Sequence, residues 1–262
     1  MAYRKVLGAM VATVSVVAVL AWALAAEPPA APKVSTFAPA KDVASQIDAY
    51  MERLQESVAS EEEFKESEAK LAKDANTMIL LALAAGLHDE DNKYKAAAPA
   101  IFKAAQELAQ AKGFAAAKAG VAAVKKSLEA TGGNPAELKW VKAASLDELM
   151  KQVPLVNSRL KRNLRGANFK KKASSNAGDA ATLAVIAQGS MADTSEAKNP
   201  EDIQKWYNFC VQMRDAAAGL NKAIRAGDQA AADKAMGALN QSCDDCHAVF
   251  HKEAPKESGK DE

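Results

Sequence analysis

The residues best suited to chemistry lie near the C-terminus, in the run Cys243-Asp244-Asp245-Cys246-His247. Two thiols with two residues between them, followed at once by an imidazole, are the pattern that covalent attachment of a c-type haem requires. The thiols would add to the two vinyl groups of the haem, and His247 would bind the iron as its proximal axial ligand. The pattern therefore predicts one covalent haem c, held by Cys243, Cys246 and His247.

Zinc is the alternative metal that the same residues could bind. Zinc sites also use C-x-x-C, but they need a second pair of ligands some distance away. Cys210 and His251 are the extra residues that the C-terminal part of the chain offers, and a zinc-binding structural module would use Cys243, Cys246, His247 and His251. A disulfide between Cys243 and Cys246 is a further alternative. If two cysteines hold haem, Cys210 is a single thiol, which we expect to be buried in the core.

The N-terminal residues predict export. Residues 1–26 begin with Tyr3-Arg4-Lys5 and end, after an uncharged stretch, in Ala23-Leu24-Ala25-Ala26, which is typical of a signal peptide. The apolar stretch at 6–26 is long for such a peptide and would anchor the protein to the inner membrane if it is not cleaved. Residues 27–40 contain four prolines among alanines and predict an extended linker. Since haem c is attached outside the bacterial inner membrane, leader and motif both indicate a periplasmic or otherwise exported protein.

The composition predicts an all-α protein. The chain is 49% hydrophobic, 5% aromatic and 26% charged, and beyond the leader its apolar residues recur every three to four positions rather than alternating. A net charge of +1, with no basic and aromatic platform, gives no indication of nucleic-acid binding.

Glycines and capping residues divide the chain into helices. Glycines that end apolar-periodic runs, as helix C-caps do, are Gly86, Gly113, Gly166 and Gly227. Capping boxes that would begin helices start at Asn134, Ser145 and Asn199. The expected helices cover residues 41–59, 66–86, 96–112 and 114–130, then 146–165, 178–191, 201–226 and 228–251. A short extra helix is expected near 135–143.

Four helices followed by four more indicate an internal repeat. Residues 47–51 line up with residues 146–150, and residues 74–78 line up with residues 179–183. In the last helix of each series, Val121, Val124 and Leu128 match Met236, Leu239 and Cys243. The offset between the copies grows along the chain, which indicates loop insertions in the second copy.

The repeat defines the domains. One copy occupies residues 41–130, a connector follows at 131–144, and the second copy occupies residues 145–251 before a charged tail at 252–262. Where the second copy has Cys243, Cys246 and His247, the first has Leu128, Thr131 and Gly132. We therefore expect one haem per chain, in the second copy.

A four-helix bundle whose last helix carries C-x-x-C-H resembles the cytochrome c′ family. The resemblance covers residues 145–251, with a degenerate haem-less copy at 41–130. The ending Cys246-His247-Ala248-Val249-Phe250-His251 is similar to the family's C-H-x-x-F-R, and Trp206-Tyr207-Asn208-Phe209 resembles the aromatic start of its third helix. The resemblance implies two tandem four-helix bundles of this type. On the last helix, the residues expected to line the wall facing the haem are Ala232, Met236, Leu239, Cys243, Cys246 and Phe250, with ordinary core packing as the alternative.

The resemblance implies two outcomes for the second axial position of the haem iron. In one group of the family an apolar side chain from the first helix covers the distal face, and five-coordinate iron binds NO or CO. In the other group a methionine from that helix binds the iron and gives a low-spin electron carrier. Met150 stands where the second group places this ligand. Pro154 removes the hydrogen bond to the Met150 carbonyl, so the helix either kinks there or begins there.

We expect one-electron transfer between unidentified redox partner proteins, and no enzymatic activity. The alternatives are a five-coordinate haem protein that binds NO or CO, and the zinc-binding module. Peroxidase-like turnover ranks lower, because no distal His or Arg suited to cleaving a peroxide is evident.

Charge is unevenly distributed between the copies. Residues 48–68 hold eight acids and two bases, whereas residues 159–172 hold seven bases and no acid. Solvated helix faces explain both stretches simply. The alternative hypothesis is that opposite charges help the two copies pack as a pseudo-dimer within the chain, and a third reading is that the basic stretch docks an acidic redox partner.

Overall fold

The computed structural model describes residues 27–250. The predicted leader at 1–26, His251 and the charged tail at 252–262 lie outside the described residues. Within the described range the chain forms nine α-helices and no strands, which confirms the all-α prediction. No helix in this range is both long and apolar enough to cross a membrane.

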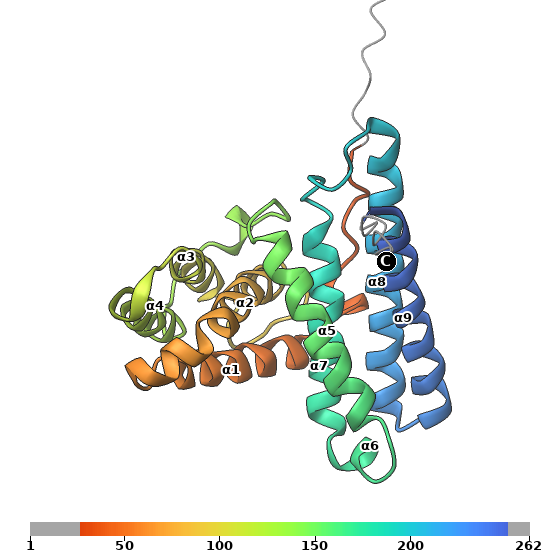
Figure 1. The fold of residues 1–262 in the computed structure, drawn as a ribbon, viewed down its shortest axis with the longest axis horizontal. Helices are drawn as coiled ribbons and strands as arrows, with labels where there is room; N and C mark the ends of the chain where they lie inside the picture. Colours follow the sequence, from red (N-terminus) through yellow and green to blue (C-terminus); the bar gives the residue numbers. More distant parts are fainter. Residues whose placement is uncertain (1–26, 251–262) are drawn as a thin grey trace, which may run out of the picture.

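The first four helices form an N-terminal set: α1 (Ala40–Glu56), α2 (Glu61–Gly86), α3 (Ala98–Ala109) and α4 (Gly113–Ser127). Each helix packs on the next in the chain, and α4 also contacts α1 (Figure 1). α2 begins five residues before its expected start at residue 66. The Ser60 hydroxyl accepts a hydrogen bond from the Glu63 backbone N–H at 3.1 Å, and three glutamates occupy the first turn. Both features stabilise a helix N-terminus, but a run of glutamates carries no apolar period.

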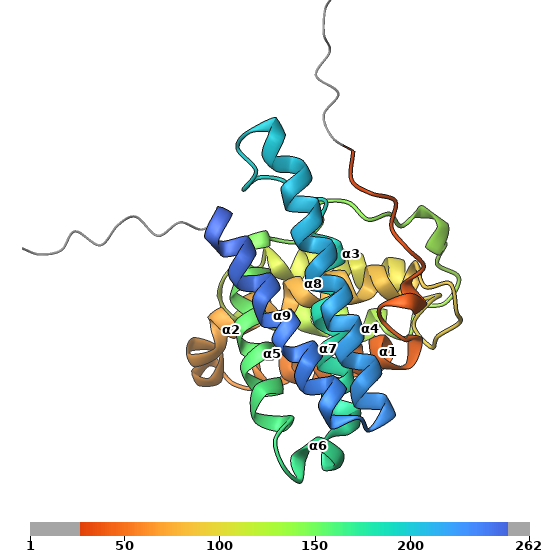
Figure 2. The same ribbon diagram turned by 90° about the vertical axis from the view of Figure 1, so that its right-hand side faces the viewer.

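The remaining helices form a C-terminal set: α5 (Leu146–Asn163), α6 (Asn168–Lys171), α7 (Ala173–Ser190), α8 (Pro200–Ala226) and α9 (Gln229–Phe250). α7 packs on α5 and α8, and α9 packs on α8 (Figure 2). The expected caps are present at Ser145, whose hydroxyl accepts from the Glu148 N–H, and at Gly227, whose φ of 70° ends α8 in the left-handed conformation. The extra helix expected near 135–143 is only the short 3₁₀ turn Pro135–Glu137.

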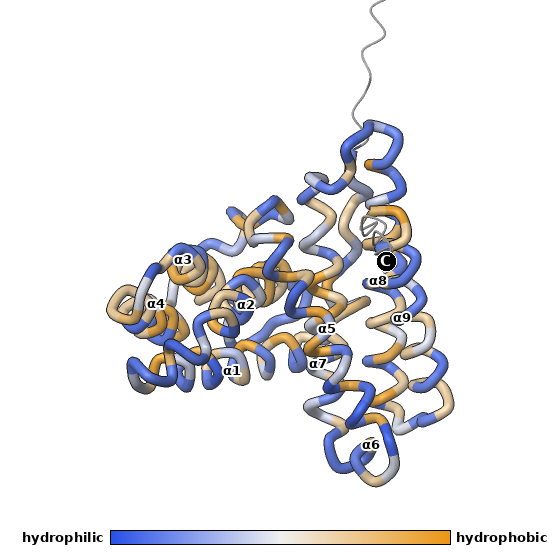
Figure 3. Tube along the Cα trace, in the orientation of Figure 1, coloured by the Kyte–Doolittle hydropathy of each residue, from blue (hydrophilic) through white to orange (hydrophobic). Residues whose placement is uncertain are grey.

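α2 and α7 are the central helices. Every residue in 74–86 of α2 and in 176–190 of α7 is buried, so other helices surround both of these segments. α7 packs against α1 and α2, and α5 packs against α2. Gly189 of α7 lies so close to α2 that an added Cβ would come within 2.6 Å of Leu80 Cδ1. One hydrophobic core therefore extends through both sets, and Figure 3 shows hydrophilic residues gathered on outer segments such as the α6 region.

Each set has a buried bidentate ion pair between its first two long helices. In the N-terminal set, Arg53 of α1 donates to Asp74 of α2, with Nε and Nη2 distances of 3.0 and 2.5 Å. In the C-terminal set, Arg159 of α5 donates to Asp179 of α7 at 2.7 and 2.6 Å. Both aspartates are almost wholly removed from solvent, so the two pairs fix the relative position of the helices that carry them.

Glutamines connect the two sets. Gln152 of α5 donates from Nε2 to the Tyr50 hydroxyl at 2.7 Å and to Asp74 Oδ1 at 3.2 Å. The Thr182 hydroxyl of α7 donates to Gln46 Oε1 of α1 at 3.1 Å. Among the described residues, no ion pair joins the acidic stretch 48–68 to the basic stretch 159–172. The observed contacts between the sets are apolar packing, hydrogen bonds from uncharged side chains, and one ion pair between Arg225 of α8 and the buried Asp42 of α1.

Candidate haem site

The C-x-x-C-H run lies in the last two turns of α9. Residues three and four apart on a helix share a face, so Cys243, Cys246 and His247 project to one side. Both cysteines are partly buried free thiols, and His247 is more exposed. The helix therefore presents two thiols and one imidazole together, which is the set that covalent haem attachment requires.

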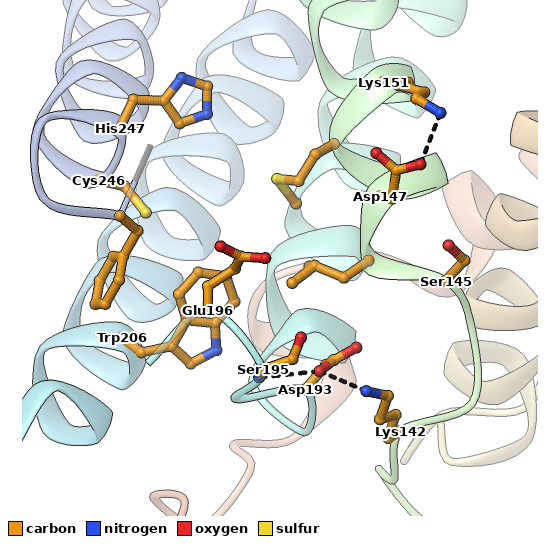
Figure 4. A pocket seen from close by; sticks show the side chains of 13 residues that line it. Lys142, Ser145, Asp147, Lys151, Asp193, Ser195, Glu196, Trp206, Cys246 and His247 are labelled. Atoms are coloured by element: carbon orange, nitrogen blue, oxygen red, sulfur yellow. Dashed lines mark hydrogen bonds and ion pairs between the residues drawn. The ribbon is translucent and has the colours of Figure 1, made fainter. Parts of the chain in front are cut away.

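A cavity of about 630 Å³ lies between the end of α9, the start of α5 and the loop that joins α7 to α8 (Figure 4). Its volume falls within the range of roughly 300–1,000 Å³ that is usual for ligand and cofactor sites. The residues that line it from the two helices are Leu146, Asp147, Met150 and Lys151 of α5, and Cys246, His247 and Phe250 of α9. In Figure 4, His247 and Cys246 lie on one side of the cavity and Asp147 and Lys151 on the other.

Met150 lies inside α5, because the helix continues through Pro154. The alternative in which the helix begins at Pro154 is therefore wrong. Pro154 has no N–H, so it cannot donate to the Met150 carbonyl, and this weakens α5 just after the residue that lines the cavity. The Met150 side chain is partly exposed and lines the cavity that His247 also lines.

The two buried ion pairs indicate another register for the expected repeat than the one read in the sequence. The two ion pairs align Arg53 with Arg159, whereas the sequence match aligned Met51 with Met150, seven residues out of step. Met150 then corresponds to Ala44. Apolar residues return to nearly the same helix face every seven positions, so the hydrophobic pattern alone does not fix the register. Met51, a core residue with 4% exposure, is therefore no guide to the role of Met150.

Aromatic residues form the wall of the cavity beside α8. Phe250 makes edge-on contacts with Trp206 and Phe209, with ring centroids 5.4 and 6.0 Å apart. The Trp206 indole donates from Nε1 to the Ser190 carbonyl at 3.2 Å, which fixes its ring. Of the residues expected to face the haem, three are buried in the main core nearer the start of α9: Ala232, Met236 and Leu239. Cys243 packs against the same core and does not line the cavity.

A polar rim surrounds the cavity. Lys142 of the connector binds Asp193 of the α7–α8 loop at 2.8 Å, and the Ser195 N–H donates to the same carboxylate at 3.1 Å. Burial alone would raise the pKa of Asp193, but these two partners outweigh it and lower the pKa. No motif in the sequence predicted this rim. Lys142 and Asp193 come from loops 51 positions apart in the chain.

Cys210 and His88, two further residues of types that can bind metals, lie in structural surroundings. Cys210 is buried beside Trp206 and Leu146, as predicted, and burial raises the pKa of its thiol. His88 is 2% exposed, with Nε2 2.9 Å from the Ala38 carbonyl and Nδ1 accepting from the Glu90 N–H at 3.0 Å. It holds a loop in place. No three His, Cys, Asp or Glu residues in the range 27–250 are arranged to hold a metal ion.

The side chains present fit a covalent haem. Two free thiols and an imidazole share one helix face, and Cys246 and His247 line a cavity of suitable size that Met150 lines from α5, while Cys243 packs against the main core. Comparison of the chain with protein-family models, with curated proteins and with solved structures finds no match. The argument for a function therefore depends on the motif and on the geometry around it.

Proposed function

We propose that this protein is an exported monohaem c-type cytochrome that transfers single electrons. The observation that carries the proposal is the lining of the cavity, which brings Cys246 and His247 of α9 together with Met150 of α5. Cys243 and Cys246 would hold the haem covalently, His247 would be its proximal ligand, and Met150 its distal ligand. The bound haem would supply the redox chemistry. The buried aromatic wall would keep water from it and so raise the reduction potential.

We also propose that each helix set is a four-helix bundle of cytochrome c′ type, and that the two bundles form a pseudo-dimer. In support, α1 and α2 pack against α7, α5 packs against α2, and each set repeats the same buried ion pair. α4 ends at Ser127, before the positions that correspond to Cys246 and His247. The N-terminal set thus has no helix on which to present a proximal ligand, which supports one haem per chain.

A redox partner would approach the rim of the cavity. The basic stretch 159–172 lies around the far end of α5 (Figure 1), and 15 residues of helix separate Arg162 from Asp147. At about 1.5 Å per residue this is roughly 22 Å, so a partner on the basic stretch would lie far from the haem. The rim instead carries mixed charges, with Lys142, Lys151 and Glu196 among them. Export to the periplasm remains a proposal based on residues 1–26.

A five-coordinate haem that binds NO or CO is the second candidate. Leu146 lies one helical turn before Met150 and lines the same cavity. An apolar side chain at this place would cover the distal face without binding the iron. Met150 would be the distal ligand because its thioether lines the cavity from α5, opposite His247. The two functions differ in spin state and are separated by one measurement.

Visible spectra of the oxidised and reduced protein, produced in a host that matures c-type cytochromes, test the proposal. We expect sharp reduced α and β bands and the weak long-wavelength absorption of methionine-bound ferric haem. Both should be lost in Met150→Ala and kept in Met51→Ala, which removes a core methionine of the N-terminal set that does not line the cavity. A high-spin spectrum that Met150→Ala leaves unchanged would support gas binding. A protein without a Soret band would support the zinc module.

A further inference from the structure

We propose that the N-terminal set holds the distal wall of the haem cavity in place and thereby sets how firmly Met150 binds the iron. The inference rests on the proposed function. Its basis is that segment 142–152, which supplies one wall of the cavity, is tied to the N-terminal set at three points. The Gln106 side chain of α3 donates to the Ala143 carbonyl at 3.1 Å, and the other two ties lie on either side of Met150.

The tie before Met150 fixes the start of α5. The backbone N–H of Ser145, the N-cap residue, donates to Asn76 Oδ1 of α2 at 2.7 Å. Asn76 is 4% exposed, and its own Nδ2 donates to the Ala72 carbonyl at 2.8 Å. Because both the oxygen and the nitrogen of the Asn76 amide are hydrogen-bonded, the side chain is fixed on α2 and the position of Ser145 follows that of α2.

The tie after Met150 is the buried side chain of Gln152. Its Nε2 donates to the Tyr50 hydroxyl and to Asp74 Oδ1, and the residue is fully buried. Tyr50 is also held, since the Arg53 guanidinium lies 4.6 Å from its ring centroid. Hydrogen bonds shielded from water in this way are costly to break, because the groups left behind find no other partner.

The position of Met150 needs such support. α5 packs mainly on α2 and α7, and its first two turns border the cavity on the other side. Pro154 removes one hydrogen bond of the helix at the same place. Groups that do not touch a metal but orient its ligand commonly change site affinity by about 10- to 100-fold. Tyr50, Asn76 and Gln152 are therefore positioning residues, and orienting Met150 is a role for the haem-less set.

A matched pair of variants of the full-length holoprotein tests this inference. Tyr50→Phe deletes the hydroxyl that accepts from Gln152. Thr182→Val deletes the hydroxyl that donates to Gln46, in a contact between the same two sets that ends on α7, away from Met150. Carbon monoxide binding to the reduced protein reports release of Met150 from the iron. We expect Tyr50→Phe to bind CO about fivefold faster, which corresponds to about 1 kcal/mol, and to weaken the long-wavelength band, while Thr182→Val leaves both unchanged.

Each outcome separates the inference from the proposed function. Equal effects of the two variants would mean that general loosening of the contact between the sets is responsible, which overturns the inference. An unchanged Tyr50→Phe in a protein that has the methionine band would overturn it too, with electron transfer intact. A parent protein without that band would overturn the proposed function, and the inference with it. If Tyr50→Phe yields no holoprotein, the same CO and spectral measurements on Asn76→Ala, which removes the acceptor for the Ser145 N–H, decide between these outcomes.

Discussion

Ionisation of Tyr50 should destabilise the protein at alkaline pH. The side chain is 1% exposed, and burial raises its pKa from 10.0 to about 12, although the Arg53 guanidinium acts in the opposite direction. Between these two values the unfolded chain loses the tyrosine proton while the folded protein keeps it. The stabilising contribution is therefore complete below pH 10 and falls as the pH rises toward 12. A shift of this size corresponds to a loss of about 2 kcal/mol by pH 12.

Tyr50→Phe gives the control for this titration. At neutral pH the variant should be less stable by about 1 kcal/mol, because Gln152 loses a hydrogen-bond acceptor. Above pH 10 the parent loses stability that the variant, with no ionisable ring, keeps. The two stability curves should cross at about pH 10 to 11, where the stability that the parent loses by ionisation of Tyr50 equals the hydrogen-bond stability that the variant lacks.

Urea unfolding followed by far-UV circular dichroism, repeated at closely spaced pH values, measures both curves. Curves that fall in parallel through the alkaline range would refute the reasoning. They would mean either that Tyr50 titrates normally or that its hydroxyl is not buried between α1 and α5. The same variant in the CO experiment then has a known cost in stability, so a change in haem ligation can be told apart from general weakening.

Two further predictions concern thiols and glycines. The chain has three cysteines, and haem attachment would leave only Cys210 free, so denatured holoprotein should react with one equivalent of a disulfide reagent. In the native protein this reaction should be slow, because the Cys210 thiol is buried. Three reactive thiols would contradict covalent attachment. Gly189→Ala should lower the free energy of unfolding by about 1–3 kcal/mol through overpacking against α2, whereas Gly219→Ala, in open space on α8, should raise it by about 0.5–1 kcal/mol. Thermal or urea unfolding of the two variants compares them, and equal effects would mean that α2 and α7 are not in close contact.

Helices with a regular apolar period were predictable from the sequence, and those without it were not. α8 was placed within one residue at each end, and the start of α9 within one residue; the expected end of α9 at residue 251 lies outside the described residues. The start of α7 at Ala173 was missed, because Ser174, Ser175 and Asn176 interrupt the apolar pattern. Asn176 is nevertheless buried. The burial of such residues depends on helices that arrive from elsewhere in the chain, and no local pattern records that.

At the candidate site, too, residues within a sequence pattern were predicted and residues outside one were not. Residues that belong to a motif, Cys246 and His247, were found at once, and Phe250 followed from helical spacing. Met236 shares that spacing but lies too near the start of α9 to reach the cavity. Lys142 and Asp193 were missed, since their contact depends on two loops that meet only in the folded protein.

Hydrophobic burial is the main reason that the two helix sets stay together. α2 from residue 74 and α7 from residue 176 are buried on every side, so separating the sets would expose apolar faces of both helices to water. The polar groups at the contact include uncharged donors such as Gln152 and Thr182. One ion pair, between Arg225 of α8 and Asp42 of α1, also joins the sets, whereas the ion pairs of Arg53 and Arg159 each stay within one set. Since burial is nondirectional, it can hold the sets together but cannot fix α5 to a fraction of a turn. The buried hydrogen bonds supply that direction, and they do so on both sides of the residue that we propose as the distal ligand.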